Sequence, residues 1–237
     1  MTRIGFRFAF CYFVLYFLAS NAFQLLPGGL SGRYLEAWDP IVLWLGGKLP
    51  LPYEVSLESR SVGNTAYGTV LFLCFLATAA MATAVWSVLD RKRTGYERLH
   101  SWLRLLLRFM LAGSMIHYGV IKAIPSQMTA PPPMGLMLFR IGDLMLNHLL
   151  WWTVGASPPF ETLIGLAEIL GGLLLLWPRT VLLGSLVCAA NTLFIFLLNM
   201  CYDVPVKLPS FHLFVMAVVL IAPSLCRLAD VFLFNRR

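Results

Sequence analysis

The chain has 237 residues, of which 59% are hydrophobic and only 12% are charged, and its formal net charge is +7. Soluble globular domains carry about a quarter charged residues, so this composition excludes an ordinary soluble protein. The apolar residues form uncharged runs of roughly 20, the length with which an α-helix crosses a bilayer. They lack the polar–apolar alternation of membrane β-barrels. The sequence therefore predicts an all-α protein that crosses a membrane several times.

The first apolar run extends from Phe6 to Leu25, with Arg3 before it and Arg7 at its start. Small residues around Ala22 resemble a signal-peptide cleavage site, so a cleaved leader is the alternative to a membrane span. The run is long enough to span, and further runs follow it. We therefore favour a helix that stays in the membrane.

A long external loop is predicted for residues 26–65, between the first run and a second span at 66–89. Trp38 and Trp44 lie in this loop among apolar neighbours, a pattern typical of a segment at the membrane interface. Residues 1–102 are thus expected to form an N-terminal extension of two spans.

Residues 103–237 predict a bundle of four further spans. Their expected bounds are 105–124, 160–177, 180–200 and 210–225. A basic loop is expected from Asp90 to Arg104. The apolar segment 136–154 contains Arg140 and Asp143, and we interpret it as interfacial or partly re-entrant rather than as a seventh span.

The distribution of basic residues predicts the orientation. With six spans, most arginines and lysines fall on the side of the N-terminus, including residues 91–93 and the final Arg236 and Arg237. Loops rich in Lys and Arg stay in the cytoplasm. Both termini are therefore expected on the cytoplasmic side of a bacterial inner (plasma) membrane, and this bias explains the net charge without nucleic acid as a partner.

Glu168 is the most informative polar residue, because it lies near the middle of the predicted span 160–177. A charge at such a depth costs a few kcal/mol, so it is either functional or paired with another span. Lys122, at the end of the preceding span, is the natural partner, although a lysine near a helix end can also snorkel to the headgroups. Tyr118 shares a helix face with Lys122, and His117 does not.

A group of polar side chains maps to the outer half of the predicted bundle, from four spans or their ends. The candidates are Lys122, Glu161, Glu168, Asn199, Asp203 and His212, with His117, Tyr118 and Asn191 as secondary candidates. One interpretation is an ordinary network of hydrogen bonds between helices. The other is a site that moves protons, since histidine titrates near neutral pH. No CxxC pair and no metal-ligand spacing occurs, so neither a dithiol relay nor a metal site is predicted.

The bundle region also resembles a known family. The resembling motifs are Arg108-Phe109, Tyr118-Gly119-Val120-Ile121-Lys122, Gly165-Leu166-Ala167-Glu168-Ile169-Leu170-Gly171-Gly172, and the Asn199-to-Lys207 segment followed by His212. In these motifs, residues 104–225 resemble the DoxX-like family of bacterial integral membrane proteins. The resemblance implies a DoxX-like four-helix membrane core at 103–237, preceded by the two N-terminal helices. Some members are linked to thiosulfate:quinone oxidoreductase, but no catalytic residue carries over.

Two functions are compatible with these features. The first is a membrane subunit of, or accessory to, a redox complex that faces the periplasm. The sequence shows no evident cofactor, but a quinone is possible. Electrons would then come from a partner protein. The alternative is a non-enzymatic scaffold or assembly subunit, and a small-solute carrier is less favoured because no internal repeat is visible. The expected partners are membrane lipid and either another protein or a second copy of the chain, and the sequence does not decide whether the protein is an enzyme.

Overall fold

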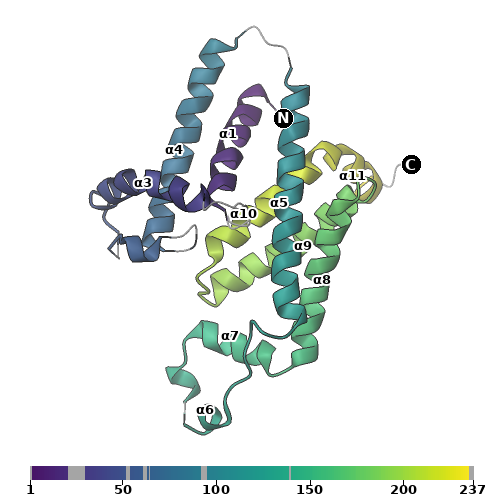
Figure 1. Cartoon of the computed structure of the whole chain (residues 1–237). Coiled ribbons are helices and arrows are strands. Elements are labelled where there is room, and N and C mark those ends of the chain that lie inside the picture. Colours follow the sequence, from purple (N-terminus) through teal and green to yellow (C-terminus); the bar gives the residue numbers. More distant parts are fainter. Residues whose placement is uncertain are drawn as a thin grey trace. The chain divides into compact units, whose positions relative to one another are not determined.

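The computed structural model describes residues 2–20, 30–51, 54–60, 63, 65–91, 95–138 and 140–234 (Figure 1). Within these residues the chain forms helices and turns but no β-strand. Five stretches of the described chain are long and apolar enough to cross a membrane. They are α4 (Ala66–Leu89), α5 (Glu97–Ala123), α8 (Pro158–Leu176), α9 (Val181–Cys201), and the stretch Lys207–Phe232 that contains α10 (Lys207–Ile221) and α11 (Leu225–Phe232). The prediction of an all-α chain with several membrane-length helices is confirmed at this level.

The helix bounds show where hydropathy predicted the fold well and where it did not. Helix α4 coincides with the predicted span. Helix α5, in contrast, begins at Glu97, so the expectation of a loop as far as Arg104 was wrong. Arg98 and Arg104 lower the local hydropathy, but arginine is a good helix former. The helix therefore begins before its apolar run does.

The segment between α5 and α8 contains only short helices. They are α6 (Pro133–Leu138), a 3₁₀ turn at Ile141–Asp143, and α7 (Leu146–Gly155). The 10 residues of α7 extend about 15 Å, roughly half of the hydrocarbon thickness of a bilayer. The segment is therefore not a seventh full span, in agreement with the sequence analysis.

Two compact units divide the chain, and the first comprises residues 1–107. In this unit α1 (Arg3–Ala19) packs against α4. Near the start of α1, the buried Arg7 donates hydrogen bonds to Ser87 Oγ and to the carbonyl of Asp90, both at 2.8 Å and both at the end of α4. Tyr96 Oη also accepts hydrogen bonds from the Arg7 guanidinium, at 2.7 and 3.1 Å. These contacts make α1 and α4 antiparallel.

Helix α3 (Leu30–Gly46) also belongs to the first unit and packs mainly on α4, as does a short 3₁₀ turn at Leu57–Ser59. The ring centroids of Trp38 and Phe75, a residue of α4, are 5.1 Å apart. Asp39 accepts a hydrogen bond of 2.7 Å from the hydroxyl of Tyr67. Trp44 is 63% exposed. Of the two tryptophans in the predicted interfacial segment, one is thus used in packing and the other is exposed, and the interfacial location stays a prediction.

The second unit, residues 108–237, contains the end of α5 together with α6 to α11. Helix α9 contacts both α8 and α10. Residues 177–180 join α8 to α9 so tightly that Gly184 touches the backbone at Leu174 and Leu175. Helices α8 and α9 therefore run antiparallel.

Glycines bring the end of α5 into direct contact with α8. A Cβ on Gly119 would lie 2.7 Å from the carbonyl oxygen of Gly165, and a Cβ on Gly165 would clash with the backbone nitrogen of Ala123. About two turns along α8 from Gly165, Gly172 packs against Ala112 and Ile116 of α5. Small residues allow membrane helices to approach this closely, and the approach sets the distance between side chains on the two helices.

The glycine contact yields a matched pair of substitutions in one helix. Gly119→Ala should destabilise the protein by about 1–3 kcal/mol, because the added methyl group meets backbone atoms of α8. Gly113→Ala, where nothing lies within 4 Å of the added carbon, should be neutral or stabilising by up to about 1 kcal/mol, since alanine favours helix. Thermal unfolding in mild detergent measures both, and equal midpoints for the two variants would contradict the close contact.

Candidate functional site

A buried ion pair lies at the contact between α5 and α8. Lys122 Nζ is 2.8 Å from Glu168 Oε1 and 3.0 Å from Oε2, and the two residues are only 6% and 1% exposed. Lys122 therefore points to Glu168 rather than snorkelling to an interface. Tyr118, one turn before Lys122, places its ring centroid 5.8 Å from the ammonium group.

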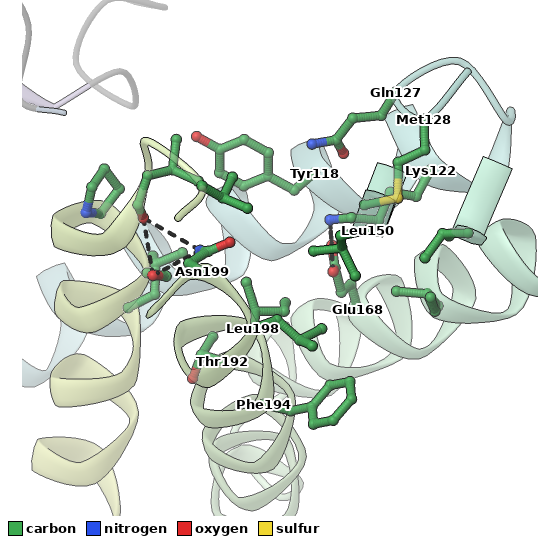
Figure 2. Close-up of a pocket in the computed structure, with 18 of the residues that line it drawn as sticks. Tyr118, Lys122, Gln127, Met128, Leu150, Glu168, Thr192, Phe194, Leu198 and Asn199 are labelled. Carbon is green, nitrogen blue, oxygen red and sulfur yellow. Dashed lines mark hydrogen bonds and ion pairs between the residues drawn. The ribbon is translucent and has the colours of Figure 1, made fainter. Parts of the chain in front are cut away.

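A pocket of about 270 Å³ opens beside this ion pair (Figure 2). Its walls come from α5, α7, α8, α9, α10 and the segments between them, and they are mainly apolar. The polar residues on its wall are few. They are Tyr118, Lys122, Gln127, Glu168, Thr192, Asn199 and Ser210. A largely apolar cavity with a few convergent polar groups is the usual form of a small-molecule site.

Asn199 forms a second polar position on the wall, apart from the ion pair in Figure 2. Its Nδ2 donates to Ser210 Oγ at 3.1 Å and to the carbonyl of Val206 at 3.5 Å. These bonds fix the amide at the junction of α9 and α10. Thr192 contributes less, because its hydroxyl donates to the carbonyl of Cys188 in its own helix at 2.6 Å.

Glu161 is fully buried but does not line the pocket. Its Oε1 accepts hydrogen bonds from the backbone N–H groups of Gln127 at 3.2 Å and Met128 at 3.0 Å. Its Oε2 has no hydrogen-bond partner among the described residues. The two residues that it holds do lie on the pocket wall.

The end of α9 and the start of α10 place two other candidates away from the pocket. The side chain of Asp203 is 80% exposed and pairs with Lys207. His212 is buried, with Nδ1 2.6 Å from the carbonyl oxygen of Leu208, and it does not line the pocket. The predicted cluster of six residues is therefore divided, and only Lys122 and Glu168 share the pocket wall with Asn199.

The secondary candidates also separate. Asn191 Nδ2 donates to the carbonyl of Ala167 at 3.0 Å and so connects α9 to α8. His117 is exposed, with its ring against that of Tyr118, and only Tyr118 lines the pocket.

Some wall residues were not recognised in the sequence. Gln127, Met128 and Trp151 belong to the connection between α5 and α8, whose path has no periodic signal. Ser210 carries no charge to mark it. Among the described residues, no group of three or more His, Cys, Asp or Glu side chains could hold a metal ion. The arrangement is suited to a mainly apolar ligand with a polar end.

The fold and the site together define a helical membrane protein with an ion pair buried between two of its membrane-length helices. A comparison with curated proteins finds 32% identity over 114 residues with the uncharacterized protein YwoB of Bacillus subtilis (strain 168), covering 48% of this chain and 71% of that protein. The chain belongs to the same family as YwoB. No family model matches the chain, and no solved structure matches it.

The ion pair should show strong coupling in a double-mutant cycle. Lys122→Met or Glu168→Leu alone leaves one buried charge without its partner and should cost about 3–5 kcal/mol. The double variant K122M/E168L removes both charges, so its loss should be much smaller than the sum of the two single losses. Unfolding in SDS-containing micelles measures the three free energies, and simple additivity would show that the pair does not form.

Proposed function

We propose that the chain binds a lipophilic ligand with a polar head, a quinone, in the pocket beside Lys122 and Glu168. In this proposal it is a membrane subunit of, or accessory to, a redox complex. The observation that carries the proposal is a buried ion pair on the wall of an otherwise apolar cavity. A quinone has the matching form, with a hydrogen-bonding ring and an apolar tail.

The ion pair has unused hydrogen-bonding capacity that suits a quinone carbonyl. A lysine ammonium group carries three protons, and the two oxygens of Glu168 occupy two directions around Lys122. The third proton is available to a ligand, and the hydroxyl of Tyr118 is on the same wall. Reduction of a quinone to a quinol takes up two electrons and two protons. Electrons would come from a partner protein, and protons would pass through Glu168 and Lys122.

The position of Phe194 supports a ligand that arrives from the lipid. This residue of α9 lines the pocket and is 62% exposed. If α9 crosses the bilayer, its exposed residues face lipid tails. An apolar tail could then extend past Phe194 while the polar head stays at Lys122.

The second unit also supports the proposal of a DoxX-like core. The end of α5 runs antiparallel to α8, because Arg108 donates to the carbonyls of Leu175 and Leu176 at the end of α8, whereas Lys122 pairs with Glu168 further back. With α9 and α10, these are the four helices that the proposal assigns to a DoxX-like core.

Six spans with both termini inside are likewise a proposal. Helix α1 is 17 residues long and ends at Ala19, where Ser20 adopts an extended backbone, whereas the predicted first span continued to Leu25; residues 21–25 lie outside the described residues. Its antiparallel packing on α4, fixed by Arg7, supports α1 as the sixth span of a bacterial inner membrane protein. The relative YwoB is itself a bacterial protein.

The topology proposal can be tested with reporter fusions. A green fluorescent protein fused after Arg237 should fluoresce in a bacterial host, and alkaline phosphatase at the same point should be inactive, because both termini lie in the cytoplasm. The opposite pattern would require an odd number of spans or the inverse orientation.

Quinone binding can be measured by quenching of tryptophan fluorescence, since Trp151 lines the pocket. Titration of the full chain in lipid nanodiscs with a short-tailed ubiquinone should give saturable quenching. Glu168→Gln should weaken binding at least tenfold by disturbing the group that holds Lys122. The double variant K122M/E168L tests the same point in a protein without an unpaired buried charge.

Two controls make this measurement specific. Asp203→Asn changes an exposed acid beyond the pocket and should leave the dissociation constant unchanged. Trp151→Phe should reduce quenching while binding, followed by calorimetry, persists. Absence of saturable binding would overturn the quinone proposal, and stoichiometric purification with a partner protein in that case would favour the scaffold alternative.

A further inference from the structure

We propose that Glu161 is a positioning residue that holds the segment Gln127–Met128 over the pocket and so controls access to the site. The identity of the ligand rests on the proposed function, but the role of Glu161 in closing the pocket does not. The role follows from the hydrogen bonds between the first turn of α8 and the chain that leaves α5.

Three hydrogen bonds attach this segment and the end of α5 to the first turn of α8. Both backbone N–H groups, of Gln127 and Met128, donate to the same oxygen of Glu161. The hydroxyl of Thr162, the next residue in α8, donates to the carbonyl of Ala123 at 3.3 Å. Glu161 and Thr162 therefore fix the chain on both sides of the turn at 124–126.

The end of α7 closes on the same segment. A Cβ on Gly155 would lie 2.5 Å from the carbonyl oxygen of Met128, so the two backbones are in direct contact. Helix α7 contributes Trp151 and Val154 to the pocket wall. The segment held by Glu161 and the helix that covers the pocket are thus one connected structure, and release of Gln127–Met128 would loosen both.

Packing alone does not account for a carboxylate at position 161. The residue is 0% exposed, and one of its oxygens has no partner among the described residues. An apolar side chain would fill this volume without the cost of burying a charge or an unpaired polar atom. The carboxylate is explained by the two N–H groups, because bonds to an ionised acceptor are roughly twice as strong as neutral ones. Its place in the first turn of α8 adds a favourable helix dipole.

The reactivity of a thiol at position 128 tests this role directly. In a chain with Cys11, Cys74, Cys201 and Cys226 replaced by serine, Met128→Cys introduces a reporter on the held segment, and the rate of its modification by a polar maleimide is followed in nanodiscs by mass spectrometry. Adding Glu161→Ala should raise this rate about tenfold or more, because both N–H bonds are lost. Glu161→Gln keeps an accepting oxygen and should stay within about threefold of the unsubstituted rate.

Cys188 is the internal control, because it is fully buried between α8 and α9. Its modification should remain slow in every variant. An unchanged reporter rate in Glu161→Ala would overturn the proposal, and so would a parallel rise at Cys188, which would indicate general unfolding. If the reporter responds to Glu161→Ala but no quinone binds, the positioning role stands and the proposed ligand falls.

Discussion

The site depends on the backbone contact between α5 and α8. In a bilayer, helices gain little from hydrophobic burial against each other, so close packing and polar contacts must hold them together. Gly119 and Gly165 supply the close packing, and Lys122 and Glu168 supply the polar contact. The two depend on each other, because a lysine and a glutamate can pair at 2.8 Å only if their helices stay at this separation, and a buried charge without a partner would force them apart.

Stability alone does not require this ion pair. Two well-packed apolar side chains in place of a buried ion pair are often as stable or more stable. What apolar residues would not provide is a proton donor and a carboxylate on the wall of an apolar pocket. The placement of Lys122 and Glu168 on that wall, rather than deep in the helix contact alone, is therefore the physical reason for the proposal that they bind a ligand.

The sequence predicted the features that depend on the composition along one helix. It missed those that depend on which way a side chain points around the helix axis. The bounds of α4 followed from an uninterrupted apolar run, and the partner of Glu168 followed from the position of Lys122 at the end of the preceding predicted span. His212, in contrast, lies two residues after Ser210, about 200° around the helix, so only Ser210 faces the pocket. Gln127 and Trp151 could not be predicted, because their positions depend on tertiary contacts of an aperiodic segment.

The two buried glutamates of α8 show how position along a helix determines the partner of a buried acid. Glu161 and Glu168 are seven residues apart, about 10 Å along the axis. Around Glu168, in the middle of α8, neighbouring N–H groups are used in the helix itself, so another side chain must supply the compensating charge, and Lys122 does so. Around Glu161, in the first turn, the connecting chain brings free N–H groups from Gln127 and Met128. The acid in the middle of α8 therefore joins two helices, and the acid in its first turn binds the connecting segment. In the role proposed for Glu161, one helix face both forms the polar end of the pocket and fixes its cover.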